Sequence, residues 1–160
     1  MVTVRPATPR DLDALAWMGA ELARIHHGFD PLRFMYGEGF ERGYRSWFAQ
    51  ELANADVCFR VVDDEAGAAV GYVYGRLEGK DWADLLDDHA ALIDIYVKPD
   101  ARLHGAGEAL LRAFCAWADD KGAPRVVLST ATPNVAAQKL FARVGFRSTM
   151  IEMTRERSPR

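Results

Sequence analysis

The sequence has few of the features that mark several large classes of protein. Its two cysteines, Cys58 and Cys115, lie far apart and belong to no CxxC or Cys/His cluster. We therefore expect reduced thiols rather than a disulfide framework, and we expect no metal site. Acidic residues outnumber basic ones, 23 against 20, which gives a net charge of -3. This balance argues against a dedicated nucleic-acid surface, which would need a basic stripe.

Long hydrophobic runs are missing as well. No apolar run is long enough to cross a bilayer, and the first residues, "MVTVRPATPRD", lack the basic head, apolar stretch and cleavage site of a secretory signal. We expect a soluble, cytoplasmic protein with no membrane partner. A chain of 160 residues can bury a core without metals or disulfides, so we expect a single domain over residues 1–160.

What the sequence does contain is an alternation of strand and helix patterns. The predicted strands cover residues 3–7, 57–63, 68–78, 91–97, 125–130 and 146–154. The predicted helices begin after an N-cap at Thr8, cover residues 38–52, run from Gly107 to Gly122, and begin again with Thr132 as cap and Pro133 as the first residue. This order predicts an α/β (α+β) fold, with a mixed central sheet covered by helices on both faces.

The connection between the predicted strands 91–97 and 125–130 indicates where a ligand would bind. A right-handed crossover through the intervening helix makes these two strands parallel neighbours. The loop 98–107 then lies at their carboxyl ends, which is where open α/β sheets place their ligands.

That loop contains Gly105 and Gly107 directly before a helix, with Arg102 just upstream. Glycine permits a positive φ, and the free N–H groups at a helix start favour a phosphate. Arg102 would add a fork of charged donors. The alternative is a tight strand-to-helix turn in which Arg102 is only solvated, and G-x-G alone does not decide between the two.

Two nucleotide-binding fingerprints fail on this loop. A Rossmann loop needs Gly or Ala three residues after Gly107, where this sequence has Leu110, and no Walker G-x-x-x-x-G-K-[ST] run is present. The pattern that fits is [QR]-x-x-G-x-[GA], from Arg102 to Gly107.

With "IYVKPDAR" before this pattern and "NVAAQKLFARVGF" after it, the sequence resembles the GCN5-related N-acetyltransferase (GNAT) family over essentially its full length. The resemblance implies a sheet that splays between strands 91–97 and 125–130, with acetyl-CoA in the gap. It implies an acyltransferase that moves an acetyl group to a primary amine of a small molecule or peptide by direct attack, without a metal. A non-catalytic acyl-CoA-binding or regulatory module of the same fold is the alternative, and another acyl donor, such as propionyl- or succinyl-CoA, is a third possibility.

The resemblance also implies which residues bind the co-substrate. Backbone groups of two strand residues would pair with the pantetheine arm, and the loop 102–108 would carry the pyrophosphate. Asn134 either meets the pantetheine or is simply a polar residue of the first helical turn. The implied binding residues are Ile95, Val97, Arg102, Leu103, His104, Gly105, Ala106, Gly107, Glu108 and Asn134.

At the catalytic positions the sequence departs from the family's pattern. Many relatives have a tyrosine acid where this sequence has Phe141, and relatives with an acid at the position of Ile93 use it as the base. Asp94 is the candidate base here, against a role in a structural ion pair, and Tyr96 is a candidate for proton handling, against sheet packing. Strict alternation turns both away from Ile95, unless a bulge reorients the strand.

Acceptor contacts are expected from the front half of the chain. Residues 24–39 contain His26 and His27, each either structural or in the site. The acidic run 78–90 is either a solvated face or an attraction for a cationic amine. The acceptor stays unidentified, and a homodimer is expected by analogy with the family.

Overall fold

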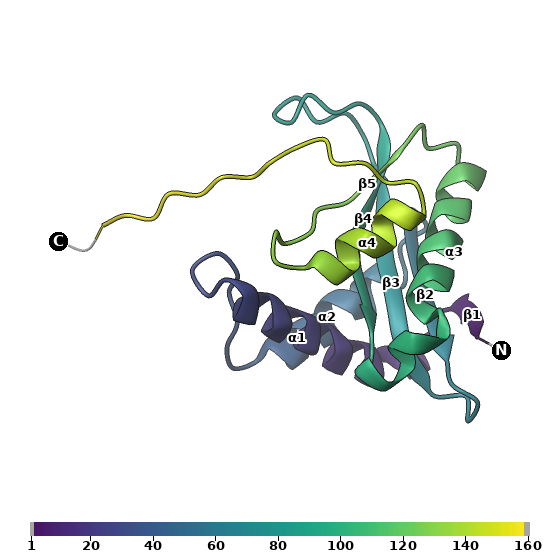
Figure 1. Cartoon of the computed structure of the whole chain (residues 1–160). Coiled ribbons are helices and arrows are strands. Elements are labelled where there is room, and N and C mark those ends of the chain that lie inside the picture. The colour runs from purple at the N-terminus through teal and green to yellow at the C-terminus, as the bar shows by residue number, and fades with distance from the viewer. Residues whose placement is uncertain (1, 159–160) are drawn as a thin grey trace.

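The computed structural model describes residues 2–158, except for the side chains of Leu103 and His104. Within this part, five strands form one mixed sheet in sequential order (Figure 1). The strands are β1 (Thr3–Pro6), β2 (Val57–Asp63), β3 (Ala69–Glu78), β4 (His89–Val97) and β5 (Val126–Val127). The helices are α1 (Leu12–Phe29), α2 (Phe40–Glu51), α3 (Ala106–Asp120) and α4 (Val135–Arg143), with short 3-10 turns η1 (Pro9–Asp11) and η2 (Pro99–His104).

Two hydrophobic cores cover the two faces of this sheet. On one face, α1 and α2 bury the aromatic side chains of the sheet, with Phe48 against Tyr72 and Tyr74. On the other face, α3 packs with Leu110 and Phe114 fully buried, and α4 adds its own apolar side chains to the same cluster. The predicted mixed sheet with helices on both faces is confirmed, and Figure 1 shows α1 and α2 on the opposite side from α3.

The strand β4 contains an irregularity at Ile93. In its antiparallel pairing with β3, Tyr74 lies opposite Asp94 but the next residue of β3, Gly75, lies opposite Leu92. Ile93 is therefore an extra, bulged residue, which is 40% exposed. The faces change across it, because Leu92 belongs to the core under α3 whereas Asp94 points to the side of α1 and α2.

The sheet opens between β4 and β5. The two strands are parallel, as predicted, but they pair only at Ala90 with Val126 and at Ala91 with Val127. Beyond these two pairs β5 ends, while β4 continues for six more residues to Val97. The second half of β4 therefore has no β5 partner.

Three details of the predicted elements are wrong. The strand predicted over residues 125–130 covers only Val126–Val127. Residues 146–158 form no strand and lead away from the body of the protein (Figure 1). Their apolar side chains Met150, Ile151 and Met153 are 76%, 82% and 89% exposed, and the two-residue β5 offers no ladder long enough for a further strand beside it. The last helix also begins two residues later than predicted, because Asn134 caps it by accepting a hydrogen bond from Ala137 N at 3.3 Å.

Both cysteines carry free thiols, as predicted, with Cys58 buried and Cys115 half-buried. Among residues 2–158, no helix combines the length and the apolar character needed to span a bilayer. In the same part of the chain, no group of three or more His, Cys, Asp or Glu side chains is arranged to hold a metal ion.

Candidate active site

A cavity of about 610 Å³ lies where β4 and β5 part. Its floor is the bulged stretch of β4, which contributes Ile93, Asp94 and Ile95. Two walls rise from this floor, one from each half of the chain. The cavity therefore exists because β5 does not pair with the second half of β4.

One wall is polar and comes from the segment after β5. We call it the polar wall, and it consists of Ser129, Thr130 and Asn134. Phe141 of α4 lies beside it and is 7% exposed, with its ring 6.0 Å from that of Phe146. The polar wall provides hydroxyl and amide groups, and Phe141 adds an aromatic ring beside it. None of these four side chains is a titratable acid.

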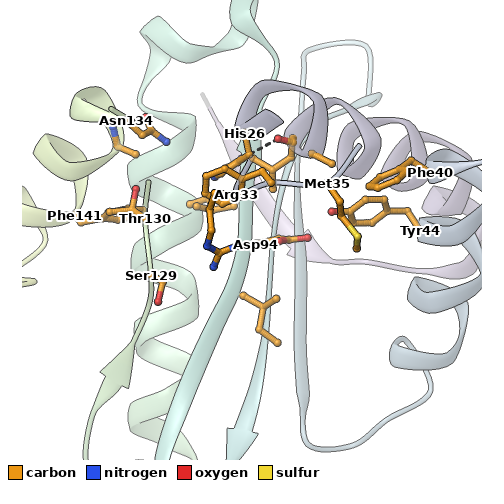
Figure 2. Close-up of a pocket in the computed structure, with 16 residues that line it drawn as sticks. His26, Arg33, Met35, Phe40, Tyr44, Asp94, Ser129, Thr130, Asn134 and Phe141 are labelled. Atoms are coloured by element: carbon orange, nitrogen blue, oxygen red, sulfur yellow. Dashed lines mark hydrogen bonds between the residues drawn. The ribbon is translucent and has the colours of Figure 1, made fainter. Parts of the chain in front are cut away.

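The opposite wall is apolar and comes from α2 and from the loop between α1 and α2. We call it the apolar wall, and it consists of Phe34, Met35, Phe40 and Tyr44. Figure 2 shows Met35, Phe40 and Tyr44 on the opposite side of Asp94 from Asn134 and Phe141. The segment 24–39, expected to contact the acceptor, thus contributes directly to the cavity.

Asp94 lies between the two walls. The Tyr72 hydroxyl donates a hydrogen bond to its Oδ2 at 3.2 Å. Burial raises the pKa of Asp94 to about 6, and the bond from Tyr72 offsets only part of that rise. The carboxylate is therefore ionised at neutral pH, yet it holds a proton more tightly than an ordinary aspartate.

Tyr44 is held in the apolar wall by a close approach of α1 and α2. A Cβ atom at Gly19 would lie 2.5 Å from Tyr44 Cδ1, so only glycine leaves room for the ring at that position. Burial, and then the charge of Asp94, raise the pKa of Tyr44 well above its usual value. Its hydroxyl thus stays protonated.

The two histidines of α1 have different surroundings. His26 lines the cavity, and its Nδ1 lies 2.8 Å from Leu22 O. Because a carbonyl only accepts, the Nδ1–H of His26 is the donor in this contact. His27 does not line the cavity, and its Nδ1 bonds to Phe34 O at 2.7 Å.

The loop 98–107, which contains Gly105, lies at the end of β4, next to the cavity floor. Arg102 Nε donates to Val97 O at 2.8 Å, and the guanidinium lies 5.8 Å from the Tyr96 ring. Gly105 has a φ of +76° and precedes α3, whose first N–H groups have no acceptor within the helix. Glu108, in the first turn of α3, pairs with Arg112 at 2.8 Å.

The structure brings some of the predicted residues together and separates others. Asp94, Ile95 and Asn134 line the cavity. The side chain of Tyr96 does not line it, since it is 5% exposed within the core under α1. The remaining predicted binding residues lie outside its lining: Val97 of β4, Arg102 of η2, Gly105, and Ala106, Gly107 and Glu108 of α3. The side chains of Leu103 and His104 lie outside the described part.

Sequence reasoning missed Phe40 and Tyr44, which come from α2. Aromatic residues at helical spacing normally indicate core, and only the tertiary structure shows that these two face a cavity. The acidic run does not line the cavity. Asp81, for example, is exposed and accepts backbone N–H bonds from Ala83 and Asp84 within its own loop.

Comparison with known proteins supports the resemblance found in the sequence. The model of the Acetyltransferase (GNAT) family matches residues 22–146, which is most of the chain. The Uncharacterized N-acetyltransferase YobR of Bacillus subtilis (strain 168) is 29% identical over 117 residues, which are 71% of this chain and 43% of that protein. The chain therefore spans less than half the length of this relative.

Another relative is similar to this chain over most of both lengths. The Aminoglycoside N(6')-acetyltransferase type 1 of Stenotrophomonas maltophilia is 28% identical over 149 residues, 92% of this chain and 87% of that protein. Among solved structures, the BH1408 protein from Bacillus halodurans matches with a TM-score of 0.84 at 17% identity, over 98% of this chain and 99% of that one. A predicted acetyltransferase with acetyl-CoA from Clostridium acetobutylicum matches with a TM-score of 0.73 at 14% identity, over 96% of each chain. These two structures establish a shared fold.

Asp94→Asn should make the protein more stable at high pH than at low pH, relative to the native chain. Because the folded pKa of Asp94, about 6, lies above its ordinary value of 3.8, its ionisation weakens the fold as the pH rises between these values. Asparagine removes this cost, so we expect a gain in the free energy of unfolding of roughly 2 kcal/mol at pH 8 relative to pH 4. Urea denaturation at pH 4, 6 and 8 measures it.

The matched control is Asp84→Asn, which changes an exposed aspartate outside the cavity. An Asp94→Asn effect of equal size at pH 4 and pH 8 would contradict the assigned pKa.

Proposed function

The chain belongs to the Acetyltransferase (GNAT) family, and we propose that it is an acetyl-CoA-dependent N-acetyltransferase acting on a primary amine. The observation that carries the proposal is the ionisable Asp94 on the floor of a cavity that opens where β4 loses its partner β5. The aminoglycoside acetyltransferase relative supports an amine as the acceptor.

The residues around the open edge of β4 fit the co-substrate. The second half of β4 has no strand partner on this side, which leaves the backbone groups of Ile95 and the N–H of Val97 for a pantetheine arm, in the manner of an added strand. The Val97 carbonyl is taken by Arg102 Nε. The helix start after Gly105 and the remaining guanidinium N–H groups of Arg102 suit a pyrophosphate. Asn134 both caps α4 and faces the cavity, so the two roles expected for it are compatible. Bound acetyl-CoA supplies an acetyl group as a thioester.

Asp94 serves as the base. The acceptor's ammonium first passes one proton to Asp94. The neutral amine nitrogen then forms a bond to the acetyl carbon, the carbon–sulfur bond breaks, and the proton that the nitrogen sheds reaches the departing thiolate through water. Asp94 releases the proton it took from the ammonium to solvent after each turnover. With a pKa of about 6, Asp94 accepts that proton more readily than an ordinary aspartate would. Tyr96 is not among the residues that line the cavity, and the proposal gives it no proton.

Phe141 cannot supply a proton to the leaving sulfur, although it lies at the polar wall. A thiol has a pKa near 8.5, so the thiolate leaves without a dedicated acid at a modest cost in rate. A single domain over residues 1–160, a cytoplasmic location and a homodimer stay predictions from the sequence.

The activity is tested by mixing acetyl-CoA with a panel of primary amines and peptides, measuring free thiol and identifying products by mass. Asp94→Asn should lower kcat/KM about 100-fold because it removes the base. The exposed Asp84→Asn serves as the control and should leave the rate unchanged. Acetyl-CoA binding without thiol release across the panel would favour the non-catalytic module instead.

Arg102→Ala should weaken acetyl-CoA binding about tenfold, because it removes charged donors beside the proposed pyrophosphate position. Isothermal calorimetry measures the dissociation constant, with Arg10→Ala, an exposed arginine of η1, as the control. An unchanged affinity in a folded Arg102→Ala protein rules out the pyrophosphate role.

Phe141→Tyr should maintain or raise the rate of thiol release, by up to about tenfold, because it adds a proton donor at the polar wall. The readout is kcat, with circular dichroism to check the fold. If kcat falls while the fold is preserved, Phe141 shapes the site and its missing acid does not limit turnover.

A further inference from the structure

The cavity can neutralise one positive charge. Its titratable lining residues, within the described part of the chain, are His26, Arg33, Tyr44 and Asp94. Asp94 is the one carboxylate among them. The positive charge of Arg33 is already neutralised, because its guanidinium makes a two-point ion pair with Glu152, with Nη2 2.9 Å from Oε2.

The side of the cavity away from the polar wall is otherwise apolar. Met35 of the apolar wall is 83% exposed, and therefore gains from being covered by a ligand. The rings of Phe34 and Phe40 in this wall also pack against neighbouring groups. The Phe34 ring has the His26 ring at 5.1 Å on edge and the Arg33 guanidinium at 4.9 Å, and Phe40 lies 5.2 Å from Tyr36. A rigid apolar surface binds a flat or branched apolar group with little loss of side-chain entropy.

Resting on the proposed function, we infer that the acceptor is a monoamine with an aromatic or branched apolar body. Its ammonium contacts Asp94, and its body contacts Phe34, Met35 and Phe40. A polycation gains less there, because any further ammonium placed inside the cavity would lose its hydration without a second lining carboxylate to replace it. The acidic run, which would be the source of further carboxylates, does not line the cavity.

The test compares four amines with acetyl-CoA: phenethylamine, propylamine, spermidine and the aminoglycoside kanamycin. We expect kcat/KM for phenethylamine to exceed that for each of the others about tenfold to hundredfold, because only its ring covers the apolar wall. Thiol release with kanamycin or spermidine that equals or exceeds that with phenethylamine overturns the inference while leaving the acetyltransferase proposal intact. No thiol release with any amine overturns both.

Variants of the apolar wall test whether this wall causes the preference for phenethylamine. Phe34→Ala and Met35→Ser should each lower the phenethylamine-to-propylamine ratio of kcat/KM about tenfold. Met35 is exposed enough for its substitution to leave the fold intact. Trp82→Ala removes an equally exposed apolar side chain outside the cavity, 83% exposed, and should keep the native ratio. Unchanged ratios in both wall variants overturn the inference.

Discussion

The β-bulge at Ile93 is the constraint on which the rest of the site depends. Before the bulge, Ala90 and Leu92 point into the core under α3. In a regular strand Asp94 would follow them into that core, where a carboxylate would have apolar neighbours and no water. The extra residue reverses the order, so that Ile95 packs against the α3 core and Asp94 turns toward the cavity. Without the inserted residue, the Asp94 carboxylate would be buried in an apolar core at a large cost in free energy. With it, the carboxylate lies where a ligand can reach it.

A glycine in the neighbouring strand β3 indicates the bulge, but the structure is needed to interpret it. Gly75 of β3 lies opposite Leu92 beside the irregularity, and a Cβ there would lie 2.2 Å from Ala91 O and 2.6 Å from Phe114 Cε2. A lone glycine inside a strand often marks a bulge or a close approach of another backbone. Which of these applies, and on which strand, depends on the pairing of β3 with β4 and on the approach of α3. Neither is a local property of residues 69–78.

The parts of the fold that could be predicted are those with local causes. The crossover to β5 and the glycine at the start of α3 follow from periodicity and helix-start chemistry, and both are present. The last predicted strand failed because its apolar pattern is also local, whereas a strand needs a partner ladder, and β5 pairs for only two residues. The apolar wall could not be predicted for the opposite reason. Tyr44 faces the cavity because Gly19, 25 residues earlier, admits its ring, and helical periodicity does not report contacts between helices.

Asp94 must first bind a cation as a carboxylate and then accept a proton from it, and its partial burial makes these two requirements compatible. An amine with an apolar body arrives as an ammonium ion, which needs an ionised partner in a cavity with few other polar groups. It must then lose a proton before its nitrogen can attack. An ordinary aspartate would hold the cation but accept its proton poorly, whereas a fully dry carboxyl would be neutral and hold no cation. A pKa of about 6, set by burial and moderated by the Tyr72 hydroxyl, keeps Asp94 ionised at neutral pH and raises its affinity for the proton. The cavity therefore contributes to the chemistry as well as to recognition, because the burial that raises the pKa of Asp94 also leaves its carboxylate on the cavity floor.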